Sequence, residues 1–421
     1  MSQWLLLLTC MWLGQATNTQ LASSLNSDGL KLLDQGRIIQ ATRKFRKAVE
    51  VDPQNVAALN NLGAALRKQK DYEGAVPVLQ QASRLRSDDA RIYVNLGLAL
   101  HGLGRPGEAV AALQKAALLE PGNAAVHRDL GILLTETNNA HGALEELRAA
   151  VQLDPRDAIA HEALGSTYLK LFNMPAAESE LRRAIDLDPQ SGEGHRDLGI
   201  ALRNQGKLAA AIQEFRRASA LMPENPAVHL LLGQALAKSG KRDEANAELR
   251  IAQDVSRRER DLKEARRLTR TGTELLQAGQ VLEAAAKLEE SARLNPDDSI
   301  TQYNYGVTLL LQNRLDEAID RFRISLRLNP EDANGHYSLG RALLAKGQPG
   351  DAVAPLREAL RISPDDARTH NVLAVALAEL RDFPAATAEL DTALKLEPND
   401  SLFRSNLSCV QQHREACRLI P

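Results

Sequence analysis

The sequence predicts an all-α solenoid of about eleven helix-turn-helix repeats, and three observations lead to this prediction. When a proline that recurs at multiples of 34 residues is placed at repeat position 32, every unit carries alanine at position 20. Hydrophobic residues make up 44% of the chain but aromatic residues only 3%, so alanine and leucine supply the predicted core. A fixed period of this length is typical of stacked repeat proteins. The recurring prolines are Pro53, Pro121, Pro155, Pro189, Pro223, Pro296, Pro330, Pro364 and Pro398.

Residues 1–21 precede the first repeat, and we interpret them as a signal peptide and leader. The apolar run 4–13, WLLLLTCMWL, is followed by small residues, and Gly14 and Ala16 are placed for cleavage after Ala16. The first basic side chain is Lys31, so the segment lacks the basic start of a typical signal. We nevertheless expect an exported protein, periplasmic or secreted. The run is too short to span a bilayer, so we expect no integral membrane segment after signal removal. The alternative is a cytoplasmic protein with a disordered or partner-bound leader.

Residues 22–259 divide into repeats 1–7, and repeat 6 (192–225) illustrates them. Positions 4, 7, 8 and 11 share one face of a first helix, and positions 20, 24 and 27 share one face of a second helix. Gly206 at position 15 suits a left-handed helix C-terminus, Pro223 stops the second helix, and Asn225 caps the helix that follows. Each repeat therefore predicts two amphipathic helices.

Five extra residues, 260–264, separate this block from repeats 8–11, which occupy 265–400. Arg257 stands where repeat 7 should have its stop proline, and the following sequence SRRERDLKEARR contains no helix breaker. We therefore expect the second helix of repeat 7 to continue, straight or kinked, into the first helix of repeat 8, with 260–264 as a helical insertion. Acidic residues partly offset the basic ones here, which favours a solvated helix over a site for an acidic partner.

The tail, 401–421, begins like the first helix of a twelfth repeat, and we expect it to cap the apolar end of the stack. Cys409, His413 and Cys417 are spaced four residues apart, so they share one face of a helix and are weak candidates for metal ligands. On a continuous helix the two cysteines would be about 12 Å apart, beyond the reach of a disulfide. In an oxidising compartment, a broken helix or pairing between molecules remains an alternative.

The repeat pattern resembles that of the tetratricopeptide repeat family. Position 8 is glycine in every unit except the last, where Ala374 replaces it, position 20 is alanine, and position 24 is leucine or phenylalanine. The resemblance covers nearly all of the chain. It implies a right-handed superhelix in which each repeat is stabilised by its neighbours, and a concave groove, lined by the first helices, where partner peptides bind.

The family's tryptophan at position 4 is absent, and histidine replaces it in six repeats. Because equivalent positions in stacked repeats should be roughly 8–10 Å apart, one metal ion could not bridge them. We interpret the rings as filling the slot between neighbouring helix pairs, and the alternative is a metal or haem site. These histidines are His127, His161, His195, His229, His336 and His370.

Candidate binding residues lie at the first-helix positions opposite the core, which are 2, 5, 6, 9, 12 and 13. The side chains at position 6 resemble the asparagine ladder in the repeat domain of nucleocytoplasmic O-linked N-acetylglucosamine transferases, which implies contacts to a peptide backbone. Solvation of an exposed helical face explains them equally well. These position-6 residues are Asn61, Asn95, Asp129, Asp197 and Asn304.

Two further groups of side chains occupy the same helical face. Arg128 and Arg196, at position 5, suit acidic side chains or a carboxylate of a ligand. In the C-terminal block the apolar groove-facing residues suit an apolar peptide or helix, unless they pack against the cap or between turns of the superhelix. The apolar group comprises Tyr303, Val307, Leu310, Leu311, Tyr337 and Leu344.

One motif suggests catalysis but fails the test of its spacing. His127-Arg128-Asp129-Leu130 matches the start of a kinase catalytic loop, yet it recurs 68 residues later as His195 to Leu198, and leucine stands where a magnesium-binding asparagine is needed. The net charge of -2 gives no sign of nucleic-acid binding, and no cofactor site is expected. The sequence predicts a non-catalytic scaffold that binds protein or peptide partners. The alternative is a regulatory or substrate-targeting subunit for a protein-modifying enzyme supplied in trans.

Overall fold

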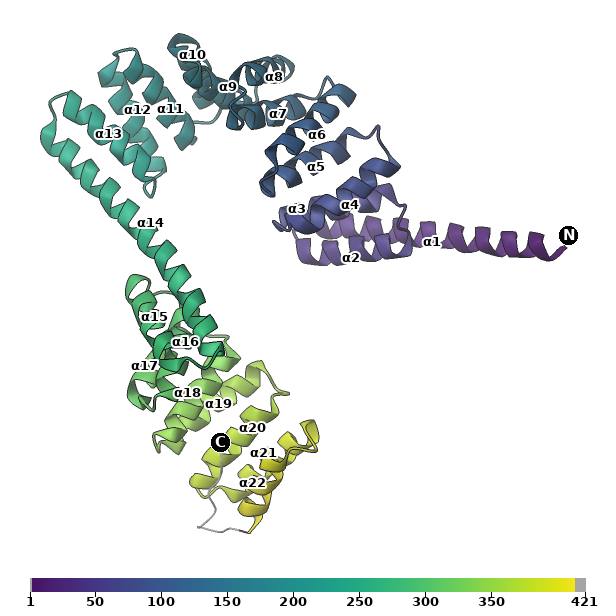
Figure 1. Ribbon diagram of the computed structural model, residues 1–421, viewed down its shortest axis with the longest axis vertical. Helices are drawn as coiled ribbons and strands as arrows, with labels where there is room; N and C mark the ends of the chain where they lie inside the picture. The colour runs from purple at the N-terminus through teal and green to yellow at the C-terminus, as the bar shows by residue number, and fades with distance from the viewer. Residues whose placement is uncertain (1, 413–421) are drawn as a thin grey trace. The chain divides into compact units, whose positions relative to one another are not determined.

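The computed structural model describes residues 2–412, with side chains from residue 18 onward, and these residues form twenty-two α-helices without a β-strand (Figure 1). The chain divides into two compact units, Met1–Gln253 and Asp254–Pro421. Within each unit, helices pair and successive pairs pack against one another. The predicted all-α solenoid is confirmed. None of the helices in the described residues combines the length and the apolar character needed to cross a membrane.

The helices of the N-terminal unit follow the predicted 34-residue frame. From repeat 2 onward, each first helix begins at position 1 and each second helix at position 17. The bounds are α1 (Ser2–Asp34), α2 (Ile38–Val51), α3 (Val56–Lys68), α4 (Tyr72–Leu85), α5 (Ala90–Gly102), α6 (Pro106–Leu119), α7 (Ala124–Glu136), α8 (Ala140–Leu153), α9 (Ala158–Lys170), α10 (Met174–Leu187), α11 (Gly192–Asn204), α12 (Leu208–Leu221) and α13 (Pro226–Lys238).

The ends of these helices are set by the residues that the sequence singled out. The side chain of Asn225 caps α13 by accepting from the backbone N–H of Ala227, and Gly206 adopts the left-handed conformation with φ of 81°. A methyl group at Gly199 would lie 2.6 Å from the buried ring of Phe215. Glycine at position 8 therefore permits the two helices of a repeat to approach closely.

The helix α14 (Arg242–Gln277) is a single helix of 36 residues that runs from repeat 7 into repeat 8. Residues 260–264 lie within this helix, and the stretch contains no helix break. Arg257, Arg258 and Arg260 are exposed, and Arg257 pairs with Asp254 at 2.7 Å.

The C-terminal unit repeats the same pairing and ends in one further helix. Helix α22 packs against α20 and α21, and its residues Phe403 and Val410 are buried. The bounds are α15 (Val281–Leu294), α16 (Ser299–Leu311), α17 (Leu315–Leu328), α18 (Ala333–Ala345), α19 (Pro349–Ile362), α20 (Ala367–Glu379), α21 (Phe383–Leu396) and α22 (Ser401–Gln411).

The position-4 histidines join each repeat to the one before it. In repeat 6, His195 Nδ1 lies 2.6 Å from a carboxylate oxygen of Glu214, and Nε2 lies 3.3 Å from the backbone oxygen of Pro189. Both partners are acceptors, so the ring makes both bonds only when each nitrogen carries a proton. The same carboxylate contact, at 2.6 or 2.7 Å, joins His127 to Glu146, His161 to Glu180, His229 to Glu248 and His370 to Glu389.

The structural interpretation of the histidine row thus gains a specific geometry, which we call the histidine latch. A latch consists of histidine at position 4, glutamate at position 23 of the same repeat, and the backbone oxygen of the preceding position-32 proline. His336 keeps the proline contact at 2.9 Å, but Pro355 stands where its glutamate should be. Within the described residues, no group of three histidine, cysteine or acidic side chains could hold a metal ion.

Candidate functional site

The asparagines of the predicted ladder are hydrogen-bonded to the preceding repeat. The side-chain N–H of Asn61 donates to Asn26 at 2.9 Å, and that of Asn95 donates to Asn60 at 3.0 Å. Both acceptors occupy position 5 of the repeat before. Because one amide donor is used within the chain, a bound peptide would meet only the remaining donor and acceptor sites of each asparagine.

Two of the other position-6 residues, Asn304 and Asp197, are bonded to position 9 of the preceding repeat, whereas Asp129 pairs with Arg128 of its own repeat. The amide of Asn304 donates to Thr273 at 2.9 Å, and the hydroxyl of Ser166 donates to Asp197. Asp197 is only 5% exposed. These bonds show that four of the five position-6 residues fix one repeat on the next. Their four partners were not identified from the sequence because they differ in type and lie in another repeat.

The two candidate arginines are already paired with carboxylates of the chain. Arg128 contacts Asp129 at 2.9 Å and Asp157 at 2.8 Å, and Asp157 also caps α9. Arg196 contacts Asp197 at 2.7 Å and forms a second ion pair with Glu193. An acidic ligand would have to displace these carboxylates, which reduces the gain from binding at Arg128 or Arg196.

Glu162, which was not among the predicted site residues, adds a carboxylate near Arg196. Burial raises the pKa of Glu162, the hydrogen bond from Ser191 opposes that shift, and the charges of Asp197 and Glu193 add to it. Position 5 in repeat 5 therefore carries an acid where repeats 4 and 6 carry arginine. The sequence already contained this signal, because aligning the repeats shows arginine, glutamate and arginine at position 5 of repeats 4, 5 and 6.

The apolar candidates of the C-terminal unit extend along one side of α16. Val307, Leu310 and Tyr303 are half-buried against the core, while Ile300 and Leu311 are each 61% exposed. Their spacing of three, seven, ten and eleven residues from Ile300 places all five on one helical stripe. We call these five residues the α16 stripe. Ile300, at position 2, was not among the predicted site residues.

Contacts within the unit hold the two tyrosines in place beside this stripe. The Tyr303 ring lies 5.9 Å from the ring of Phe322, and its hydroxyl oxygen accepts a hydrogen bond of 3.4 Å from Ser338 on α18. The guanidinium of Arg341 lies 5.6 Å from the centre of the Tyr337 ring. Tyr303 thus links α16 to α18, and both rings are positioned before any ligand arrives.

Of the three tail residues that were weak candidates for metal ligands, only Cys409 lies within the described residues. Cys409 lies in α22 and is disulfide-bonded, so its thiol is not available as a metal ligand. His413 and Cys417 lie outside the described residues.

Comparison with known proteins agrees with the helical frame. Models described as tetratricopeptide repeat or TPR repeat match residues 44–76, 65–104, 100–166, 158–191, 199–240, 269–333, 312–367 and 343–407. Among curated proteins no match was found.

Similar solved structures cover parts of the chain. They include MamA, with 25% identity and a TM-score of 0.36 over 38% of this chain and 94% of MamA. PilF of Pseudomonas aeruginosa has 20% identity and a TM-score of 0.42 over 46% of this chain and 88% of PilF. The Cut9–Hcn1 complex has 15% identity and a TM-score of 0.34 over 92% of this chain and 96% of the matched chain. Since family models match along most of its length and its helices begin at the positions that the repeat dictates, the chain belongs to the tetratricopeptide repeat family.

Proposed function

We propose that this protein is a non-catalytic scaffold that binds segments of other proteins, and that the α16 stripe is a principal binding site. The observation that carries the proposal is the exposure of Ile300 and Leu311, each 61%, at the two ends of a continuous apolar stripe. Single exposed apolar residues are ordinary, whereas a stripe that spans a whole helix favours an interaction surface.

The bound segment would be apolar along one side, as in an amphipathic helix or an extended peptide with alternating apolar residues. Burial of Ile300 and Leu311 would contribute about 1–2 kcal/mol each. Val307 and Leu310 would be covered between them, and the fixed rings of Tyr303 and Tyr337 would accept apolar side chains at little cost in conformational entropy. The phenol groups also offer hydrogen bonds to the backbone of the segment.

The N-terminal unit, taken by itself, would offer polar contacts to a bound segment. Asn61 and Asn95 each retain one amide donor, and Asp129 retains carboxylate lone pairs beside its arginine, whereas Asp197 is only 5% exposed and offers little to a ligand. We expect these contacts to be weaker than those of the α16 stripe, because a ligand would compete with bonds between repeats.

The test compares two charge-introducing variants of the full chain. Peptides selected from a displayed library for binding to the wild type should carry apolar residues at helical or alternating spacing. Ile300→Asp combined with Leu311→Asp should weaken their binding about tenfold or more, because each carboxylate would lose its water in the complex. Leu118→Asp combined with Leu282→Asp is the matched control, since both leucines are 78% exposed and lie outside the stripe. Equal affinity of all three proteins would refute the site.

We further propose that the protein is exported. The support is the apolar run 4–13 followed by Gly14 and Ala16. Mass spectrometry of the protein from its natural cells should find a mature chain that begins after Ala16. Recovery of a chain that still carries Met1 from the cytoplasm would contradict export.

A further inference from the structure

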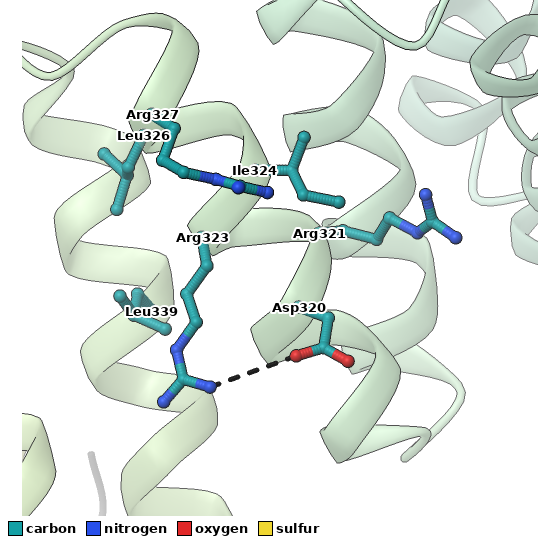
Figure 2. Close-up of a pocket in the computed structure, with 7 residues that line it drawn as sticks. All are labelled: Asp320, Arg321, Arg323, Ile324, Leu326, Arg327 and Leu339. Atoms are coloured by element: carbon teal, nitrogen blue, oxygen red, sulfur yellow. Dashed lines mark ion pairs between the residues drawn. The ribbon is translucent and has the colours of Figure 1, made fainter.

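A second surface of the C-terminal unit, separate from the α16 stripe, combines positive charge with apolar side chains. It is a pocket of about 680 Å³ formed by α17 and α18 (Figure 2). Its lining consists of Asp320, Arg321, Arg323, Ile324, Leu326, Arg327 and Leu339. The lining thus holds three arginines, one acid and three aliphatic side chains.

The arginines of this pocket are only weakly neutralised by the chain. Arg323 and Asp320 are 3.9 Å apart, at the limit of an ion pair, and their side chains are 59% and 72% exposed (Figure 2). Such pairs contribute little to stability, so a ligand could displace this one at low cost. Arg327 is exposed and has no ion pair within the described residues, and its side chain extends toward Ile324 in Figure 2.

The third arginine results from a departure from the histidine latch. Arg321 occupies position 23, which carries glutamate in the five complete latches, and Gln302 replaces the histidine. Arg321 donates to Gln302 at 3.3 Å, and its guanidinium lies 5.1 Å from the centre of the Tyr305 ring. This repeat therefore carries a fixed positive charge at the position where five other repeats carry a negative one.

The apolar part of the lining makes the pocket more than a charged patch. Leu326 is 9% exposed, while Ile324 and Leu339 are half-buried with their remaining surface turned to the pocket. Arg323 and Arg327 are four residues apart on α17, so their Cβ atoms lie on the same helical face about 6 Å apart, and their flexible side chains carry the two charges further out. A ligand that fits would carry two carboxylates, one for each arginine, and an apolar side chain between them.

We propose that this pocket binds an acidic, leucine-containing segment of a partner protein. One carboxylate of the segment pairs with Arg323 and another with Arg327, while an aliphatic side chain packs on Ile324 and Leu339. Charge complementarity selects this occupant, because the lining holds three cations against one anion. The site does not depend on the α16 stripe, so the protein would hold two different segments on one unit.

The test measures binding of a fluorescent peptide built from repeated Glu-Leu-Leu-Glu units to the full chain at low ionic strength. Arg323→Glu combined with Arg327→Glu should weaken binding about tenfold or more, and added salt should weaken binding to the wild type. The matched control is Arg46→Glu combined with Arg84→Glu. These exposed arginines occupy the same repeat positions in the N-terminal unit and change the net charge equally. The control should bind like the wild type, as should Ile300→Asp combined with Leu311→Asp.

Peptides of altered charge and apolarity test whether the pocket recognises both features of the segment. A peptide with lysine in place of glutamate should bind the Arg323→Glu, Arg327→Glu protein better than the wild type, which shows that the variant remains folded. The proposal is overturned if the wild type does not bind the acidic peptide, or if a glutamine-containing peptide binds equally well. It is also overturned if the two arginine variants lose the same affinity. Equal binding of a serine-for-leucine peptide, or equal competition by inorganic phosphate, would reduce the pocket to a general anion site and would refute a peptide site.

Discussion

The incomplete latch of repeat 10 offers a substitution that should stabilise the protein. Pro355 stands at position 23, in the middle of α19, where it removes a backbone donor, and His336 has only its Nε2 contact to Pro330 within the described residues. Pro355→Glu would restore the backbone N–H and also place a carboxylate where the five complete latches have one. Pro355→Ala would restore the N–H alone. The difference between the two variants therefore isolates the latch.

The expected magnitudes follow from the two interactions. A proline inside a helix costs up to about 3 kcal/mol relative to alanine, and because α19 has adapted to it we expect a gain of about 1–2 kcal/mol from Pro355→Ala. The latch should add about 1 kcal/mol, because it is a charge-assisted hydrogen bond. This estimate is moderate because the glutamate of the equivalent His370 latch is 28% exposed and partly screened.

Hydrogen exchange followed by mass spectrometry is the appropriate assay, because repeats open locally and one melting temperature would average over all of them. Slower exchange is expected in α18 and α19, with Pro355→Glu more protected than Pro355→Ala by about fivefold, which corresponds to 1 kcal/mol. In the background of His336→Ala, the two variants should be equally protected. Equal protection when His336 is present would refute the reasoning on the latch.

Three further predictions concern repeats 5 and 6. The hydrogen bond from Lys207, 2.6 Å long, is the main cause that lowers the pKa of Glu178 to about 2. The stability that this adds is present above the usual glutamate range and is lost as the pH falls toward 2, so Glu178→Gln should flatten the loss of helicity in an acid titration followed by circular dichroism. Burial raises the pKa of Glu162, so the folded state binds the proton of this carboxyl more tightly than the unfolded state does. Stability therefore falls as the pH rises from the ordinary glutamate pKa to the raised pKa of the folded state. Glu162→Gln should remove this fall and protect α9 against hydrogen exchange at neutral pH, and an unchanged pH profile would contradict the assignment. Gly199→Ala should lower the unfolding free energy by about 1–3 kcal/mol in urea denaturation, because the methyl group would lie 2.6 Å from the Phe215 ring; a neutral effect would refute the close-packing role.

The fold could be predicted from the sequence because its determinants are local and repeat at a fixed period. Pro223 and Asn225 mark the end of one helix and the cap of the next, and glycine at position 8 with alanine at position 20 specifies the close approach within a repeat. The continuation of α14 followed from the replacement of a stop proline by Arg257. Each of these signals involves residues that are near one another in the chain.

The chemistry of the site could be predicted only in part, because it depends on pairs of positions in different helices or repeats. The slot-filling role of His195 was expected, but its partner Glu214 was not identified, although glutamate occurs at position 23 only in repeats with histidine at position 4. The pairing of Arg128 with Asp157 joins position 5 to position 34, and periodicity alone does not indicate that these meet.

The pocket on α17 escaped prediction for a related reason. One of its three positive charges is Arg321, a departure from a latch pattern that becomes visible only after the histidine–glutamate pairs are known. The apolar α16 stripe was largely predicted, since its spacing follows the helical period, and only its outermost member Ile300 was missed.

The central claim, that the α16 stripe receives a partner segment, is tested most directly by photo-crosslinking in the natural cells. A photoreactive phenylalanine analogue is introduced at Leu311, within the stripe, or at Leu282, which is even more exposed, at 78% against 61%, but lies on α15 outside it. The scaffold function predicts a discrete crosslinked protein from position 311 that is absent from position 282 and disappears when Ile300→Asp is added. The same adduct from both positions, or none from position 311 in cells that contain the folded protein, would contradict it.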